Sequence, residues 1–369
     1  MRSRDWLHTG GALFLLFALA TPLLAGQMER KEAATDKTTV LDGVDRYRVP
    51  EPLFEGVRVI LGYRGEEYSP AYVQGISGAA FRIGGPCPCA PTCEFAMSTV
   101  DLVRLLGYEA EPVGFGEDPT AQLPAVLTRL KEEVRASRPV LAWNAFTVAE
   151  FDVVCGFDEG TSELIGRGSY KGLKDYVRGP EGRLASTEVA PAIGLVLIGK
   201  KVREFDARAA EVAALKEAVA HAHGASRTLD CLPAGLASYD YWVGAYRNRA
   251  KLARARSRDE KQDLGFVSAQ PPDDFYPLTI LPSTRQAAAE FLREIAPKYP
   301  EAKAHLEMAA EHFAGEAKAL EACVQALGDR KQTPSDEQCI RAAGCLSQAR
   351  AMYALGVEEM AAALGKIGK

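Results

Sequence analysis

The chain has 369 residues, of which 47% are apolar and 25% are charged, and its net charge at pH 7 is -5. This balance is typical of a globular protein that can bury a sizeable core, and it excludes a disordered or fibrous chain. Because no block of lysine and arginine stands out, we expect no nucleic-acid partner.

The first 25 residues have the features of a secretory signal peptide. Arg2 and Arg4 precede a mostly apolar run, Ala12 to Ala25, which is shorter than the roughly 20 residues of a membrane-spanning helix. We therefore predict export to the periplasm or the extracellular space, with membrane contact only through this segment if it stays uncleaved. Residues 26–40 are polar and lack an apolar period, which predicts a flexible leader.

Residues 41–203 alternate between helix and strand signals, which predicts an α/β domain. Apolar residues at helical spacing indicate helices, and short β-branched runs between turn residues indicate strands. The predicted helices span residues 54–65, 70–74, 97–106 and 120–137, and the predicted strands span 108–113, 139–143, 151–157, 163–166 and 192–198.

From Asp206 onward strand signals vanish, so residues 204–369 are predicted to form an all-helical domain. The proline-rich stretch Gln270–Pro282 is predicted to be a connector, and Ser283 to cap the next helix. The last two helices should form an antiparallel hairpin around residues 328–335. The predicted helices span residues 209–223, 234–256, 283–296, 300–327 and 335–365. The fold class is therefore α+β.

The richest stretch of the chain runs from Tyr72 to Glu94. It contains a Gly-x-Ser-Gly turn (Gly75, Ser77, Gly78), an apolar segment that holds Arg82, and three closely spaced cysteines. A nucleophile elbow needs a further glycine and a preceding strand, and this segment has neither. Ser77 is therefore predicted to be a turn or helix-cap residue that borders a binding site.

All eight cysteines follow the signal segment, and an oxidising compartment favours disulfides among them. Cys323 and Cys339 lie at similar distances from the predicted hairpin turn, where their Cα atoms can approach the ~5.5 Å of a disulfide. We predict that they form a bridge. The pairing of the other cysteines, at positions 87, 89, 93, 155, 231 and 345, stays open.

The cluster of Cys87, Cys89 and Cys93 has three interpretations. Three thiolates without a nearby histidine make an incomplete zinc site, so we expect no metal and no other cofactor. A disulfide fits an exported protein better. A reactive Cys87 thiol would need a base to activate it, and residues 41–203 contain no histidine.

Two carboxylates, Asp152 and Asp158, lie on one predicted strand and its turn. Their spacing places them on the same face if the strand is regular. Asp152 interrupts an apolar run and needs a partner, for which Arg82 is the natural choice, and such pairs are more often structural than catalytic. Trp143 and Asn144 end the preceding strand, where a ligand can approach.

Three stretches resemble a known family, the N-terminal domain of butirosin-biosynthesis protein H and related bacterial proteins. They are the helix Phe54–Gly65, the segment GISGAAFRI (Gly75–Ile83), and the strand pair RPVLAW (Arg138–Trp143) with FDVVCGFDE (Phe151–Glu159). The family is papain-like and distantly similar to bacteriocin-processing cysteine peptidases. The segment Ala287–Glu307 is similar to the C-terminal region of some relatives.

The resemblance implies a papain-like fold with amide-bond or acyl-transfer chemistry, but the residues for that chemistry are replaced. The peptidase cysteine position falls near Pro52, and the histidine position falls near Glu150 to Asp152. The first hypothesis is a non-catalytic module that binds a peptide or an acyl-type small molecule. The second is an amidase or acyltransferase that uses Cys87 or the Asp152/Asp158 pair. The third is an envelope protein stabilised by disulfides.

Overall fold

The computed structural model describes residues 37–49, 52–83, 97–168, 174–188, 191–224, 234–248, 275–328 and 334–367. Residues 37–369 belong to one compact unit. The predicted signal peptide and most of the predicted leader lie outside the described residues, as do Cys87, Cys89, Cys93 and Cys231. Within the described ranges, no helix is long and apolar enough to cross a membrane.

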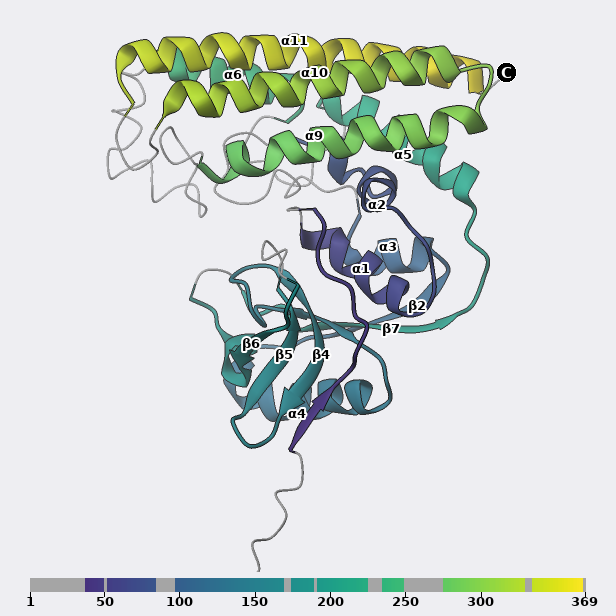
Figure 1. The fold of residues 1–369 in the computed structure, drawn as a ribbon, viewed down its shortest axis with the longest axis vertical. Coiled ribbons are helices and arrows are strands. Elements are labelled where there is room, and N and C mark those ends of the chain that lie inside the picture. The colour runs from purple at the N-terminus through teal and green to yellow at the C-terminus, as the bar shows by residue number, and fades with distance from the viewer. Residues whose placement is uncertain are drawn as a thin grey trace, which may run out of the picture. The chain divides into compact units, whose positions relative to one another are not determined.

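One antiparallel sheet contains the strands of the described residues, and they all precede residue 202 (Figure 1). The strand order is β2-β7-β3-β4-β5-β6, and β1 pairs with β4. The strands are β1 (Thr38–Val40), β2 (Tyr108–Val113), β3 (Val140–Trp143), β4 (Phe151–Asp158), β5 (Glu163–Arg167), β6 (Val177–Pro180) and β7 (Leu195–Lys201). With helices between and after these strands, the chain is α+β, as the sequence predicts.

Two strands differ from the sequence prediction. Strand β1 falls inside the predicted leader, because the β-branched run Thr38–Val40 pairs with residues 156–158 of β4. Strand β6 was not predicted, since its proline and glycine are poor strand formers, yet it pairs with β5 at the edge of the sheet. Cross-strand pairing overrides weak local propensity in β6, whereas β1 has favourable β-branched residues and was missed because of its polar surroundings.

Four helices belong to the first half of the chain: α1 (Pro52–Tyr63), α2 (Pro70–Ile76), α3 (Thr99–Leu105) and α4 (Pro119–Arg135). Helix α1 packs against β3 and β4, and its buried residues join those of α2 and α3 in the larger apolar cluster. Helix α4 contributes Val126, Leu130 and Val134 to a second apolar cluster with Val154 and Phe157 of β4. The two clusters use opposite faces of β4.

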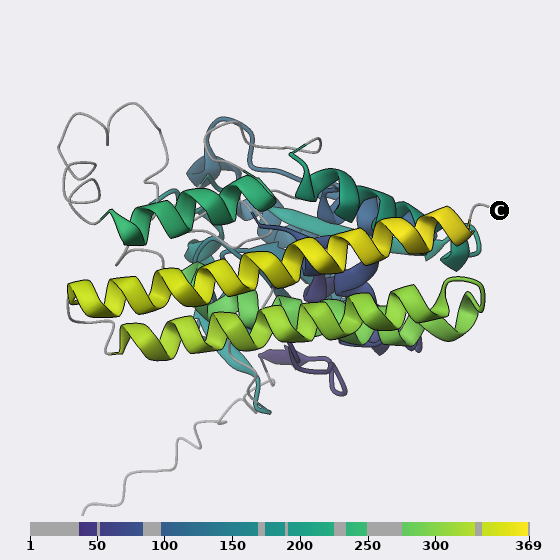
Figure 2. The same cartoon turned by 90° about the horizontal axis from the view of Figure 1, so that it is seen from above.

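The described residues after β7 contain helices and no strand. They form α5 (Ala207–Ala222), α6 (Leu236–Arg247), α9 (Phe275–Ile295), α10 (Lys303–Leu327) and α11 (Asp336–Ile367). Figures 1 and 2 both show α10 and α11 side by side along their length, which confirms the predicted hairpin.

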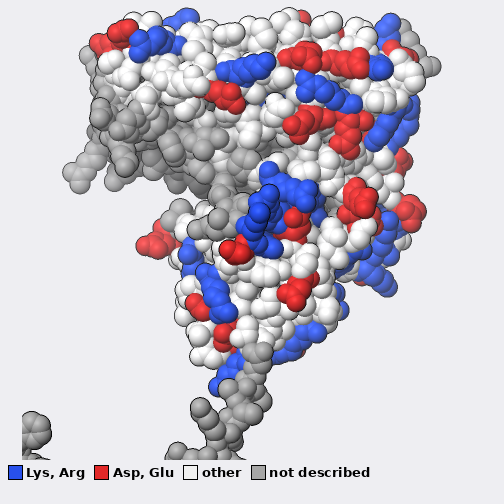
Figure 3. Space-filling model, in the orientation of Figure 1, with Lys and Arg blue, Asp and Glu red and all other residues white. Residues whose placement is uncertain are grey.

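The outer face of these helices carries both signs of charge. On the face drawn in Figure 3, acidic and basic side chains are interspersed over the long helices. The ion pairs on these helices include Arg293–Glu311 at 2.8 Å, Arg350–Asp240 at 2.6 Å and Arg341–Glu337 at 2.5 Å. Exposed pairs of this kind keep the surface solvated and add little stability each.

The predicted connector Gln270–Pro282 is partly wrong. Residues from Phe275 belong to α9, which continues through Pro282, and Ser283 lies inside this helix. The Ser283 hydroxyl donates a hydrogen bond to the carbonyl of Ile280 at 2.8 Å instead of capping a helix. The side chains of Leu278 and Leu281 are buried in the core, and this packing outweighs the cost of a proline in the helix.

Candidate ligand-binding groove

The Gly-x-Ser-Gly turn ends helix α2. Ser69 caps the start of the helix, and Ser77 is its C-cap residue, with its hydroxyl donating to the carbonyl of Gln74 at 3.2 Å. Gly78 follows at φ +80°, a left-handed conformation that favours glycine, and the short helix η1 (Ala79–Phe81) begins there. Ser77 is thus a helix-cap residue, as predicted, and not a nucleophile on an elbow.

Gly75 serves a different purpose from Gly78. A Cβ atom at position 75 would lie only 2.1 Å from the ring of Phe291. The absence of a side chain therefore lets α2 and α9 approach closely, and Phe291 packs with Tyr72 and Phe81. The glycines of this turn are explained by packing and backbone conformation.

The segment after the turn, residues 80–83, is held by helices that lie far away in the sequence. Arg285 of α9 donates to the carbonyl oxygens of Ala80 at 2.7 Å and Arg82 at 3.0 Å. Tyr353 of α11 donates to the carbonyl of Phe81 at 3.1 Å, and the Gly235 N–H donates to that of Ile83 at 3.0 Å. We call these contacts, together with that of His221 described below, the clamp.

A buried ion pair supports the clamp. The Arg285 Nε atom lies 2.6 Å from Glu316 Oε1, and both side chains are fully buried. The Tyr239 hydroxyl donates to the same carboxylate oxygen. Burial raises the pKa of Glu316, the Arg285 guanidinium lowers it, and the net effect is a rise. Sequence analysis missed this pair because its members lie on different helices.

Arg82 forms an ion pair with Glu217 of α5, whereas the sequence analysis expected Asp152 as its partner. Its Nη1 atom lies 3.2 Å from His221 Nδ1. Since a guanidinium only donates, Nδ1 accepts this hydrogen bond. Nε2 accepts a hydrogen bond from the Ile83 N–H at 3.0 Å and also lies 3.2 Å from the Ile83 carbonyl. Folding thus brings a histidine from the helical half to the segment that had none, with both ring nitrogens in contact with groups of residues 82 and 83.

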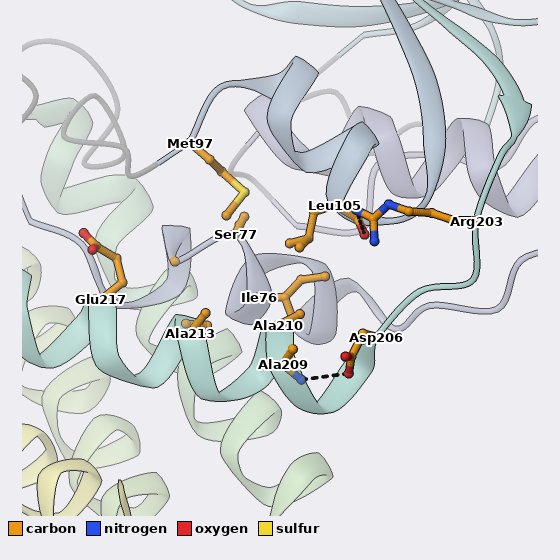
Figure 4. A pocket seen from close by; sticks show the side chains of 12 residues that line it. Ile76, Ser77, Met97, Leu105, Arg203, Asp206, Ala209, Ala210, Ala213 and Glu217 are labelled. Carbon is orange, nitrogen blue, oxygen red and sulfur yellow. Dashed lines mark hydrogen bonds between the residues drawn. The ribbon is translucent and has the colours of Figure 1, made fainter.

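A groove of about 530 Å³ lies between α2, α3 and α5. Figure 4 shows the small side chains of α5 facing Ile76, Ser77, Met97 and Leu105. The groove is lined by Ile76, Ser77, Gly78, Met97, Leu105, Arg203, Asp206, Ala209, Ala210, Ala213, Ala214 and Glu217. Its walls are mostly apolar, and its volume is within the range of small-molecule sites.

Charged side chains occupy the two ends of the groove. Arg203 and Asp206 lie near the start of α5, and Glu217 lies three turns further along the helix, paired with Arg82. The carboxylate of Asp206 caps α5 by accepting a hydrogen bond from the Ala209 N–H at 3.0 Å. Of the predicted binding residues, Ser77 lines the groove, and Arg82 adjoins it through Glu217.

The other predicted binding residues, Trp143 and Asn144, do not line this groove. Asn144 has φ +65° and holds the turn between β3 and β4, donating to the Ser186 carbonyl at 3.1 Å and accepting from the Ala149 N–H at 2.6 Å. Trp143 is 9% exposed and packs edge-to-face on Phe151.

Asp152 and Asp158 lie on opposite faces of the sheet, so the prediction that they share a face is wrong. A bulge between Val154 and Gly156 reverses the alternation, which brings Phe157 onto the same face as Val154. Asp152 accepts hydrogen bonds from the N–H groups of residues 146 and 147 at 2.6 and 2.7 Å. Asp158 pairs with Arg178 at 3.2 Å instead.

The described cysteines do not form a catalytic arrangement. Burial raises the pKa of the Cys155 thiol to about 12, so it stays protonated at neutral pH. Cys323 and Cys339 are buried on the facing helices α10 and α11, and the described part of the chain contains no disulfide. Their bridge stays a prediction for the oxidised protein. The described residues also contain no cluster that can hold a metal ion.

Sequence analysis missed most of the groove, including Arg203 and the alanines of α5. The alanine-rich face of α5 was visible in the sequence, but small residues more often permit close helix packing than line a groove. A search against models of known protein families gives no match, and a search against curated protein sequences gives none either.

Proposed function

We propose that this chain is an exported binding module of papain-like fold that holds a peptide or an acyl-type small molecule without transforming it. The observation that carries the proposal is the groove between α2, α3 and α5. It combines apolar walls with a few charged groups at its ends, which is the usual composition of a ligand site.

The papain-like part of the proposal is supported by the position of α1. This helix packs on β3 and β4, the pair that resembles the histidine-bearing strands of the peptidases. The hydroxyl of Tyr47, shortly before α1, donates to the carbonyl of Phe151 at the start of β4 at 2.9 Å. This hydrogen bond links the segment that leads into α1 to the start of β4, and the two dyad positions of the peptidases fall near Pro52 and near Glu150 to Asp152 in this chain.

The absence of catalysis is supported by the state of the candidate groups. His221 has its Nδ1 lone pair directed at Arg82, and Asp152 and Asp158 hold a turn and an ion pair. The amidase or acyltransferase alternative therefore rests on Cys87, which lies outside the described residues. The alternative of a disulfide-stabilised envelope protein predicts no ligand in the groove.

The proposal is tested by titrating the mature protein with 1-anilinonaphthalene-8-sulfonate and comparing it with Ala213→Trp. Ala213 is an exposed residue of the groove wall, so a tryptophan there fills the groove without disturbing the core. Ala361→Trp, at an exposed position of α11, is the matched control. We expect saturable binding that only Ala213→Trp abolishes. Equal fluorescence of all three proteins would refute the binding module.

The same preparation distinguishes a module from an enzyme. It is incubated with amide and thioester substrates before and after alkylation with iodoacetamide. We expect no turnover in either sample. Turnover that is lost on alkylation, together with rapid labelling of Cys87, would establish the thiol enzyme instead.

A further inference from the structure

The composition of the groove walls favours one of the two proposed ligands, a peptide or an acyl-type small molecule, over the other. The walls are built mainly from helices α2, α3 and α5, and in the interior of each helix the backbone N–H and C=O groups are bonded within the helix. An extended peptide that entered this groove would bury its own backbone groups without partners, at a cost of about 1–3 kcal/mol for each group. Among the described residues that line the groove, none belongs to a strand that could pair with such a peptide.

A hydrocarbon chain has no such cost. It needs only apolar contact, which Ile76, Met97, Leu105 and the alanines of α5 supply. The alanine side chains are short, and the residues that line the groove follow α5 from Ala209 to Glu217. An unbranched chain therefore fits this wall better than a peptide with bulky side chains.

Arg203 gives the groove a preferred end for an anion. Its Nη2 atom donates to the carbonyls of Arg104 at 2.7 Å and Leu105 at 3.3 Å, which fixes the guanidinium at the end of α3. Among the ion pairs of the described residues, none involves Arg203, so no described carboxylate neutralises its charge. The first turn of α5, with its positive dipole end, lies at the same end of the groove.

The opposite end is less suited to an anion. Glu217 lines it, and the carboxylate of this residue pairs with the buried Arg82. The groove is therefore polarised, with an open cation at one end and a neutralised pair at the other. Asp206 opposes the anion at the Arg203 end, although it is partly committed to capping α5.

We infer that the groove binds an unbranched fatty acyl chain along α5, with the carboxylate of the free acid at Arg203. This inference rests on the proposed function and narrows its two ligand classes to one. It requires no covalent step, because the protein holds the ligand by apolar contact and by one charge-assisted hydrogen bond.

The test uses isothermal titration of the mature protein with three probes: dodecanoate, dodecan-1-ol and a capped apolar hexapeptide. Dodecanoate and dodecan-1-ol share a chain and differ in the charged head group. We expect dodecanoate to bind about tenfold more tightly than the alcohol, the effect of one charge-assisted hydrogen bond, and the peptide to bind more weakly than both.

Two variants that each remove one charge locate the head group. Arg203→Gln should lower the affinity for dodecanoate about tenfold and leave that for dodecan-1-ol unchanged. Asp206→Asn keeps an oxygen that caps α5 but removes the opposing charge, so it should raise the affinity for dodecanoate. The melting temperature of each variant is measured alongside to show that it is folded.

The outcomes separate this inference from the proposed function. If the peptide binds best and Ala213→Trp blocks it, the fatty-acid inference is overturned while the binding module stands. If dodecanoate binds but Arg203→Gln has no effect, the assigned head-group position is wrong. If none of the probes binds, both proposals fail.

Discussion

Two regions of this molecule are buried to a similar degree but are stabilised in different ways. Helix α4 covers one face of the sheet, where the apolar cluster includes Val126, Leu130, Val140 and Phe157. The clamp holds residues 80–83 through Arg285, Tyr353 and His221, and the ion pair with Glu316 is fully buried beside it. The α4 face depends on apolar area, and the clamp depends on directed hydrogen bonds.

Because the two regions are stabilised by different interactions, we expect them to respond differently to amino-acid substitutions. In an apolar cluster, a substitution lowers the free energy of unfolding by an amount that grows with the side-chain volume removed. Substitutions that conserve volume are tolerated. A buried polar network is less tolerant, because removing one partner leaves another charge or carbonyl buried without compensation. The clamp should therefore be the more sensitive region, and its sensitivity should depend on pH.

The largest effect is expected from breaking the buried ion pair. Glu316→Gln leaves the Arg285 charge uncompensated and should lower the free energy of unfolding by about 3–5 kcal/mol. The comparison is made at one fixed pH, because the raised folded-state pKa of Glu316 makes the stability of wild type fall as the pH rises above 4.5, whereas the variant has no such titration. Urea denaturation monitored by circular dichroism measures the loss.

Arg285→Met should behave differently with pH. Glu316 keeps its burial but loses the guanidinium that lowers its pKa, so the pKa of this carboxyl rises further above its ordinary value of 4.5. The folded state then binds the proton more tightly than the unfolded state does. The deficit relative to wild type should shrink as the pH falls from about 8 to about 5. A deficit that grew over this range would contradict the assignment of a buried ionised carboxylate.

On the α4 face, Leu130→Ala should lower the free energy of unfolding by about 2–5 kcal/mol, because Leu130 is fully buried. Leu130→Met conserves volume and should cost less than about 1.5 kcal/mol. Neither difference from wild type should vary with pH. A pH-dependent loss at Leu130 would remove the distinction between the two regions.

A smaller effect is expected where α2 meets α9 beside the clamp. Gly75→Ala places a Cβ atom 2.1 Å from the Phe291 ring, and the resulting displacement should cost about 1–3 kcal/mol. Gly62→Ala is the control, since a Cβ there meets no atom within 4 Å. The double variant Gly75→Ala with Phe291→Leu should recover part of the loss, and no recovery would argue against this contact as the cause.

The smallest effect concerns the turn between β3 and β4. Ala149 has φ +58°, which is unfavourable for a residue with a Cβ atom, so Ala149→Gly should stabilise the protein by about 1 kcal/mol. Ala145→Gly, in the same turn without a positive φ, should destabilise it. The two changes in melting temperature should therefore have opposite signs.

Sequence reasoning succeeded where the signal is local. The amphipathic period of α4, the β-branched run of β4 and the turn before α11 predicted these elements because a helix or strand face repeats every few residues. The same reasoning predicted Ser77 as a helix cap and the α+β class. It failed for Asp152 and Asp158, because one bulged residue reverses every side chain that follows it.

The tertiary structure alone decided the clamp and the groove. Arg285 meets the carbonyl of Ala80 across 205 positions of sequence, and His221 meets Ile83 across 138. No short-range periodicity encodes such a pair. The chain itself determines which segments are helices and strands, because those hydrogen bonds and apolar faces are local. The pairing of polar groups from different segments is decided later, when the apolar surfaces pack against each other. Packing buries donors and acceptors, and these then need partners from whichever segment lies beside them.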